Sequence, residues 1–294
     1  MKPTECFLRY LRSDRGYSEC TVVGYQADLE NFEAFCRSLD EELDWQTVDR
    51  DVVRLWVVSL MEQGRSPRTV KRRLSALRSF YRYMQVTGMC NGNPADLVKS
   101  PKCDKPLPVF VKEREMDRLL DDMVFSDDYL GKRNHCILLL FYTTGIRLGE
   151  LVGLYVGDVD LSRRQLCVLG KRNKQRLVPF GEELSRELQA YLDLRQKLFP
   201  RGSDSLFLGK NGLPVEREEV RRVVRRYLSM VTTLKKKSPH VLRHTFATVM
   251  LNHGADIEAV KQLLGHESLS TTEIYAHATF AELKKEYEQA HPWA

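Results

Sequence analysis

The sequence predicts a mainly α-helical protein with a small β-hairpin, an α+β chain built from two domains. Apolar residues recur at helical spacing in four segments of residues 1–97. The stretch 165–180 alternates apolar and polar residues around a basic loop, which is typical of a hairpin. Residues 98–111 contain three prolines, which remove backbone donors and favour extended chain. We therefore expect a helical domain over residues 1–97, a linker over 98–111 and a second domain over 112–294.

The first domain is expected to contain four helices, over Thr4–Ser13, Glu19–Leu39, Asp49–Gln63 and from Ser66 to about Thr87. The fourth helix begins with a serine cap followed by proline. Its apolar side would face inward. Its outward side would carry basic residues, namely Arg68, Lys71, Arg72, Arg78 and Arg82. A four-helix unit with one basic helix fits both a DNA clamp and a plain helical bundle.

In the second domain, helices are expected over Lys112–Met123, Lys132–Thr143, Glu182–Leu198 and Glu216–Leu234. The hairpin strands would be Gln165–Leu169 and Arg176–Phe180, and Leu206–Leu208 would form a further short strand. The apolar run through residues 136–142 predicts that the second of these helices is buried.

The chain is mildly basic, and its basic residues are gathered in blocks. Lys and Arg number 46 against 40 Asp and Glu, which gives a formal charge of +6. The blocks fall at residues 65–82, 163–176 and 217–237, on separate predicted elements. Any one block fits a solvated face. Three blocks together favour an extended polyanion such as duplex DNA. The third block supplies the DNA-binding candidates Arg221, Arg222 and Arg225.

The cysteines and the apolar runs exclude several classes of protein. The seven cysteines are odd in number and never form a C-x-x-C pair, as expected for reduced thiols in the cytoplasm. Charges occupy the N-terminus where a signal peptide needs an apolar run, and no apolar run is long enough to span a bilayer. No Walker-type loop and no carboxylate cluster for Mg²⁺ is present. We therefore expect a cytoplasmic protein without membrane contact, cofactor or metal.

The segment TTGIRLGELVGL places an arginine at the start of a helix. Gly145 is expected to end one helix, Arg147 to open the next, and Glu150 to follow one turn later. One interpretation is an ordinary surface salt bridge, which contributes little to stability. The other is that Glu150 orients Arg147 so that its fork faces a phosphate.

The predicted hairpin loop carries Lys171, Arg172 and Lys174. A lysine at a hairpin tip is most often simply solvated. In a loop that reaches a DNA groove, however, an ammonium group could also donate a proton.

Residues 238–279 predict three short helices with polar groups near their ends. Ser238 is the expected cap of the first, which places His240 in its first turn and Arg243 on the same face. His266 directly follows Gly265, the expected end of the second helix, and Tyr275 falls in the second turn of the third. Imidazole, guanidinium and phenol groups at helix ends suit attack on a phosphodiester by a tyrosine hydroxyl.

A zinc site is the alternative for this stretch. His240 and His244 have the spacing of two metal ligands on one helix. The glutamate of an H-E-x-x-H motif is absent, and an arginine lies between the two histidines, where it would repel a cation. We therefore expect no metal.

The motifs TTGIRLGELVGL, LGKRNKQRLVPFGEE, SPHVLRHTFAT and LLGHESLSTTEIYAHA occur in the order found in tyrosine recombinases. The chain resembles the Xer-type chromosome-dimer resolvases of that family over nearly its whole length. Residues 1–97 resemble the family's helical core-binding domain and residues 112–294 its catalytic domain. The closing HPWA is similar to the HPRA of Xer proteins, with Trp293 in place of arginine.

The resemblance implies a role for each motif residue. Tyr275 would be the nucleophile and would form a 3′-phosphotyrosyl bond. Arg147 and Arg243 would hold the non-bridging oxygens of the scissile phosphate, and His266 would hydrogen-bond one of them. His240 would act as acid and base toward the tyrosine proton.

The resemblance also implies that a loop lysine protonates the leaving 5′ oxygen, and Lys171 matches that position. The family pattern is GKGNKER where this chain has GKRNKQR, so Arg172 replaces a glycine and Lys174 is a nearby alternative. Arg172 and Lys174 are also candidates for DNA contact.

For partners, the resemblance implies duplex DNA and a homotetramer, or a heterotetramer with a related recombinase, on paired sites. A DNA translocase is a candidate regulator. The tail from Leu283 to Ala294 would dock on a neighbouring protomer; the alternative is a frayed amphipathic helix. Chromosome-dimer resolution and the integration or excision of a mobile element both fit. The alternative function is a recombinase-like DNA-binding protein without catalysis.

Overall fold

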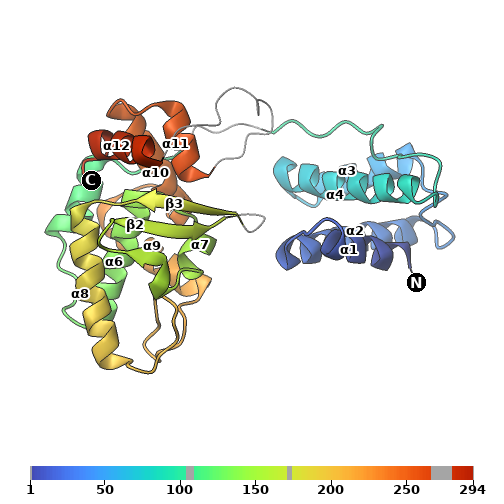
Figure 1. Cartoon of the computed structure of the whole chain (residues 1–294). Coiled ribbons are helices and arrows are strands. Elements are labelled where there is room, and N and C mark those ends of the chain that lie inside the picture. Colours follow the sequence, from blue (N-terminus) through green and yellow to red (C-terminus); the bar gives the residue numbers. More distant parts are fainter. Residues whose placement is uncertain (1, 104–108, 171–173, 266–279, 294) are drawn as a thin grey trace. The chain divides into compact units, whose positions relative to one another are not determined.

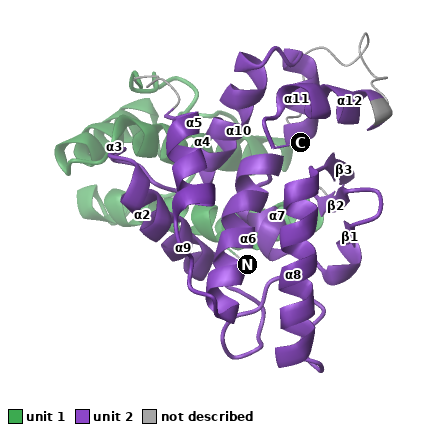
Figure 2. Cartoon of the chain, turned by 90° about the vertical axis from the view of Figure 1, so that its left-hand side faces the viewer, with its two compact units in different colours: residues 1–106 green, residues 107–294 purple. Residues whose placement is uncertain are grey.

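The computed structural model describes residues 2–103, 109–170, 174–265 and 280–293 (Figure 1). The chain forms two compact units, residues 1–106 and 107–294 (Figure 2). The division falls inside the predicted linker, while the limits 1–97, 98–111 and 112–294 stay a prediction. No helix in the described ranges combines the length and the apolar character needed to cross a membrane.

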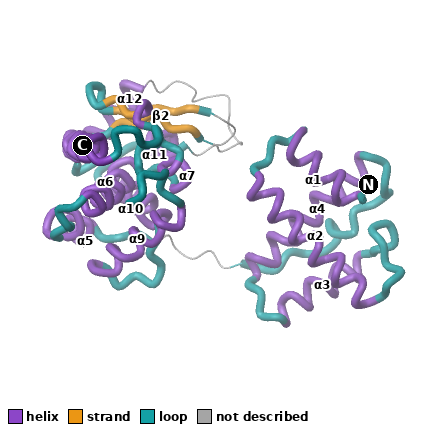
Figure 3. The backbone as a smooth tube through the Cα atoms, turned by 90° about the horizontal axis from the view of Figure 1, so that it is seen from below, coloured by secondary structure: helices purple, strands orange, loops and turns teal. Residues whose placement is uncertain are grey.

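The first unit is helical, as predicted (Figure 3). Its helices are α1 (Pro3–Ser13), α2 (Glu19–Leu39), α3 (Arg50–Glu62) and α4 (Pro67–Val86). Their core is aromatic: the ring of Phe80 lies 5.4 Å from that of Phe7 and 4.6 Å from that of Trp45, both edge-on. Edge-to-face pairs of this kind add stability beyond the apolar area that they bury.

The basic face of α4 is partly structural. Arg68 and Lys71 are exposed, as expected for a face that meets DNA. Arg72 is also exposed but binds both carboxylate oxygens of the buried Asp28 on α2. Arg78 departs from the expectation of an outward side chain, because it donates to the carbonyls of Ala95 at 3.0 Å and Val98 at 2.5 Å. It thereby fixes the segment that follows α4.

The second unit combines helices with one antiparallel sheet of strand order β1-β2-β3. The strands are β1 (Val159–Asp160), β2 (Gln165–Leu169) and β3 (Gln175–Pro179). The helices are α5 (Glu113–Asp117), α6 (Tyr129–Thr144), α7 (Leu148–Val152), α8 (Glu182–Leu198), α9 (Arg217–Val231), α10 (Pro239–Asn252), α11 (Ile257–Leu264) and α12 (Phe280–Ala290). A π-helical turn (Arg118–Asp122) continues α5, and a 3₁₀ turn (Val156–Asp158) precedes β1.

The strand predicted over Leu206–Leu208 is wrong. Only isolated bridges occur there, between Ser205 and Tyr155 and between Leu208 and Pro214. The physical reason is that side chains take the place of a strand partner. The carbonyl of Leu206 accepts from the Tyr191 hydroxyl of α8 at 3.1 Å. That of Leu208 accepts from the Arg133 guanidinium of α6 at 3.0 Å.

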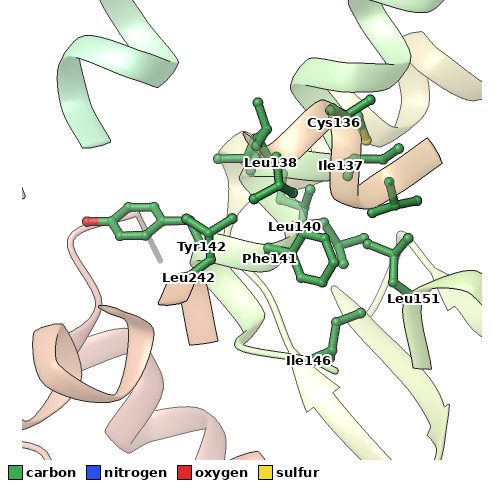
Figure 4. Packing of buried hydrophobic residues seen from close by; sticks show 14 of the residues in the cluster. Cys136, Ile137, Leu138, Leu140, Phe141, Tyr142, Ile146, Leu151 and Leu242 are labelled. Carbon is green, nitrogen blue, oxygen red and sulfur yellow. The ribbon is translucent and has the colours of Figure 1, made fainter. Parts of the chain in front are cut away.

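Helix α6 is the centre of the second unit, and α8 and α10 pack against it. Its residues 136–144 are all buried, which confirms the predicted buried helix. Figure 4 shows its side chains packed with Ile146, Leu151 and Leu242. The helix ends at Gly145 in the left-handed conformation, with φ of 59°. A Cβ there would lie 2.5 Å from Cδ1 of Phe246, so only glycine fits.

Helix α12 and the residues after it pack against α10, α11 and β3 of their own chain. Tyr287 is 1% exposed and shares a cluster with Phe246 and Leu263. The interpretation of the tail as a frayed helix is therefore wrong. The His291 ring stacks on Tyr287 at 5.3 Å and on Phe246 at 5.6 Å between centroids. With its Nδ1 accepting from the Trp293 amide, its Nε2 donates to the Tyr142 carbonyl at 3.2 Å.

Burial of His291 makes stability depend on pH. Burial lowers the pKa of His291 to about 3, although the bond to the Tyr142 carbonyl acts in the opposite direction. An unfolded histidine takes up a proton near pH ~6.5. The unfolded state therefore binds more protons between about pH 6.5 and 3, and the stability present above that range is lost as the pH falls.

We expect His291→Phe, which retains the ring stack, to remove this contribution of up to ~1.4 kcal/mol per pH unit. Urea unfolding between pH 7 and pH 5 measures the slope of the free energy of unfolding. Equal slopes for His291→Phe and the wild type would contradict the assignment.

Candidate active site

Three arginines converge on the C-terminal end of α11. Arg176 of β3 donates from Nε to the carbonyl of Leu263 at 3.0 Å. Arg243 of α10 donates from Nη2 to the carbonyl of Leu264 at 2.6 Å. Arg147, the residue before α7, donates from Nη2 to the carbonyl of Gly265 at 2.9 Å. The last carbonyls of a helix lack partners within it and lie at the negative end of its dipole, so they favour cations.

The end of a second helix also holds Arg243. Its Nη1 donates to the carbonyl of Gly145, at the end of α6, at 2.7 Å. Gly265 ends α11 in the left-handed conformation that Gly145 also adopts, with φ of 64°. The turns that these glycines permit direct two helix ends at one guanidinium group. Arg243 is consequently 7% exposed and fixed on two sides.

Glu150 connects two of the arginines, and its side chain is 5% exposed. Its oxygens accept from the backbone N–H of Arg147 at 2.7 Å and from Nη1 of Arg147 at 2.8 Å. They also accept from Nη1 and Nη2 of Arg176 at 2.8 and 2.9 Å. The interpretation as a surface salt bridge is therefore wrong, since Glu150 is buried and orients Arg147. That the fork of Arg147 faces a phosphate stays a prediction.

The electrostatics of this cluster favour an added anion. Burial alone would raise the pKa of Glu150, but hydrogen bonds from Arg176 and Arg147 outweigh it, and the pKa is lowered. Burial and then the charges of Arg147 and Arg176 lower the pKa of Arg243 to about 10, against the opposing effect of Glu150. Glu150 and Arg243 are thus both charged at neutral pH. Three guanidinium groups share one carboxylate, which leaves an excess of positive charge where a phosphate could bind.

His240 lies in the first turn of α10, one turn before Arg243. Partial desolvation, followed by the charges of Lys236, His244, Arg243 and Arg221, lowers the pKa of His240. The neutral imidazole therefore predominates at neutral pH, and this is the form that can accept a proton.

Ser238 lies at the start of α10, as expected, but does not cap it with a hydrogen bond. Ser238 occupies the N-cap position but makes no capping bond with its side chain. Its Oγ is buried and has no hydrogen-bond partner among the described residues.

The predicted site residues have different outcomes in the structure. It brings Arg147 and Arg243 together at one helix end. His240 is close enough that the charge of Arg243 helps to lower its pKa. Four predicted residues lie outside the described residues, namely Lys171, Arg172, His266 and Tyr275. Lys174 is described and exposed, and its carbonyl accepts from the Gly170 amide at 2.8 Å.

Sequence reasoning missed Arg176 as part of the cluster. A signal was present, because Arg176 has the strand parity of the buried Val178 and pairs across the hairpin with the buried Val168. A charged residue on the inward side of a strand needs a partner, since a buried unpaired charge is costly. The identity of that partner required the fold.

Helix α9 presents the third basic block beside the cluster. Its buried side carries Val220, Val224 and Leu228. Arg221, Arg222 and Arg225 are exposed, as expected for DNA-binding candidates. Arg221 is near enough to contribute to the lowered pKa of His240. The positive charge of α9 thus continues that of the arginine cluster.

Comparison with known proteins places the chain in a family. The model of the phage integrase family matches residues 109–282, and that of the phage integrase N-terminal SAM-like domain matches residues 4–86. Tyrosine recombinase XerC of Chlorobaculum tepidum is 38% identical, over 98% of this chain and 94% of that protein. Tyrosine recombinase XerD of Oceanobacillus iheyensis is 33% identical, over 99% of this chain and 98% of that protein.

Solved structures are similar as well. The crystal structure of XerA recombinase matches with a TM-score of 0.50 and 29% identity, over 99% of this chain and 98% of that one. The XerH site-specific recombinase, bound to its difH substrate, has the same fold with a TM-score of 0.70 and 23% identity, over 99% of this chain and 85% of that one. With both domains matched and relatives aligned over nearly the full length, the chain belongs to the phage integrase family, among the tyrosine recombinases.

Proposed function

We propose that this chain is an Xer-type site-specific recombinase that cuts and rejoins duplex DNA through a 3′-phosphotyrosyl bond to Tyr275. The observation that carries the proposal is the placement of Arg147 and Arg243 at one helix end, 2.9 and 2.6 Å from successive carbonyls. The XerC and XerD relatives, identical at 38% and 33% of aligned positions, support the same activity.

The arginines act on the phosphate. A guanidinium has five N–H donors in a rigid fork that matches phosphate oxygens. Two donors of Arg243 go to carbonyls at 2.7 and 2.6 Å, which fixes the plane of its fork. Negative charge accumulates on the non-bridging oxygens as the nucleophile attacks. Arginines held in place beforehand stabilise that transition state more than the ground state.

Two proton transfers accompany the attack. A tyrosine hydroxyl has a pKa of ~10 and needs a base. His240, in its neutral form, would accept the proton from Tyr275. As the bond from Tyr275 oxygen to phosphorus forms, the bond from phosphorus to the 5′ oxygen breaks, and Lys171 or Lys174 would protonate that oxygen. The phosphotyrosyl bond retains the energy of the broken bond, so rejoining by the reverse steps requires no cofactor.

The proposed activity implies an oligomeric state and a cellular location. Strand exchange needs paired sites, so we propose a homotetramer, or a heterotetramer with a related recombinase, in the cytoplasm, with a DNA translocase as regulator. The tail from Leu283, which includes Tyr287, would then leave Phe246 and Leu263 of its own chain and bind a neighbouring protomer. The XerC and XerD relatives favour chromosome-dimer resolution over movement of a mobile element.

We expect Tyr275→Phe to abolish formation of a covalent protein–DNA adduct, because the phenyl ring lacks the attacking oxygen. The assay uses a nicked suicide duplex that carries the candidate site, from which the cleaved fragment diffuses away. Denaturing gels measure the adduct, and gel shift measures binding, which the variant should retain. An adduct with Tyr275→Phe would mean another nucleophile. A wild type that binds without forming an adduct would favour the silent DNA-binding alternative.

The two loop lysines can be separated with a substrate whose leaving 5′ oxygen is replaced by sulfur. A thiolate leaves without prior protonation, so only loss of the general acid is rescued. We expect Lys171→Ala to cleave the phosphate substrate on the order of 10²–10⁴-fold more slowly and to regain most of that rate with sulfur. Lys174→Ala is the matched variant, and rescue of Lys174→Ala alone would reverse the assignment.

A further inference from the structure

We propose that Arg176 is a positioning residue for DNA cleavage: from β3 it holds Glu150 and the last turn of α11, and so fixes Arg147 for the scissile phosphate. The inference rests on the proposed function, because it assigns a task to a residue beside the arginines that would bind the phosphate. Arg176 is the last residue of the GKRNKQR motif, and the resemblance assigned it no role.

The contacts of Arg176 assign it an indirect role. Its side chain is 16% exposed, and all three of its nitrogens are engaged. Nη1 and Nη2 face the two oxygens of Glu150 at 2.8 and 2.9 Å, and Nε faces the Leu263 carbonyl at 3.0 Å. Because each nitrogen of the guanidinium group already donates to the protein, we infer that Arg176 acts on the phosphate through its neighbours. Those neighbours are the carboxylate that orients Arg147 and the helix whose end accepts from Arg147 and Arg243.

The surroundings of Arg176 are shaped for this side chain. A Cβ on Gly265 would lie 3.2 Å from Nη1 and 3.3 Å from Cζ of Arg176, so the glycine that ends α11 also leaves room for the guanidinium. Lysine at position 176 could supply a charge but could not reach two carboxylate oxygens and a carbonyl in one plane. The geometry therefore calls for arginine and not merely for a cation.

Loss of Arg176 would act on Arg147 through Glu150. Among the residues that the structure describes, the charged groups that face Glu150 are Arg147 at the start of α7 and Arg176 of β3, and Arg243 of α10 is close enough to interact. Without Arg176, burial still raises the pKa of Glu150, while the largest opposing contribution is gone. Glu150 would then take up a proton at higher pH than in the wild type and release Arg147. Cleavage by the variant should therefore decline as the pH falls over a range in which the wild type is unaffected.

The experiment compares two nicked suicide duplexes that carry the candidate site. One has a normal scissile phosphate, and the other has a methylphosphonate, in which a methyl group replaces a charged oxygen. Cleavage of the neutral linkage depends less on the arginines. A variant that only misplaces them should therefore differ less from the wild type on methylphosphonate than on phosphate. A variant with a general defect in folding or DNA binding should differ equally on both. Single-turnover cleavage rates are measured with saturating protein for Arg176→Gln, Arg176→Lys and Arg147→Ala. The matched control is Arg186→Gln, which breaks an exposed arginine–glutamate pair on α8.

We expect Arg176→Gln to cleave the phosphate substrate about 10- to 100-fold more slowly, the scale of losing charged hydrogen bonds. On methylphosphonate the difference from the wild type should shrink to a few-fold at most, as with Arg147→Ala. The rate of Arg176→Lys on the phosphate substrate should lie between those of Arg176→Gln and the wild type. Its difference from the wild type should also shrink on methylphosphonate. Arg186→Gln should match the wild type on both substrates. The rate of Arg176→Gln should also begin to fall at a higher pH than the rate of the wild type as the pH is lowered.

Two results would overturn the inference. One is wild-type cleavage of the phosphate substrate by Arg176→Gln, and the other is an equal defect on both substrates. If Arg176→Gln does not fold, judged by thermal melting, the same ratio of rates for Arg176→Lys decides. Failure of the proposed function looks different, because the wild type would then form no adduct, or Arg147→Ala would show no rescue.

Discussion

The C-terminal end of α11 is the constraint on which the site depends. Its carbonyls at Leu263, Leu264 and Gly265 each accept from a different arginine. Two unit charges 4 Å apart repel by ~4 kcal/mol at an effective dielectric constant of 20, so gathering three guanidinium groups is costly. The negative helix end and the buried Glu150 offset that repulsion. The same hydrogen bonds that complete the helix therefore place the cations before DNA arrives.

The electrostatics of the arginine cluster also bear on the proposed binding of a phosphate. The pKa of Arg243 falls to about 10 through burial and the nearby charges of Arg147 and Arg176. Its charged form is thus less favourable here than in water. A phosphate between these residues would relieve the repulsion, and the added negative charge of a transition state would relieve it further. The repulsion among the arginines and the proposed stabilisation of the transition state thus have one origin.

The sequence predicted most of the fold because its signals are local. The helices of residues 1–97 and the end of α6 at Gly145 follow from periodicity and caps within a few residues. Arg147 and Glu150 could be paired for the same reason, three positions apart. The partners of Arg176 lie 26 and 87 positions away, so no local pattern could identify them. The strand predicted at Leu206 is wrong for a similar reason. The distant Tyr191 of α8 donates to the Leu206 carbonyl, which a neighbouring strand would otherwise have paired.

Residues 266–279, which include His266 and Tyr275, lie in the sequence between α11, whose end binds the arginines, and α12. Before it, the Gly265 carbonyl accepts from Arg147 at 2.9 Å. After it, α12 packs against α10, α11 and β3 through Tyr287 and the residues around it. Among the described residues, Glu150, α6 and α11 hold the arginines, and no hydrogen bond to them comes from α12. The proposed transfer of α12 to another protomer would therefore change one attachment of the segment that carries Tyr275 and leave the arginine cluster assembled. In the proposed assembly, exchange of α12 would thus act on the segment that carries Tyr275 and not on the arginines proposed to hold the phosphate.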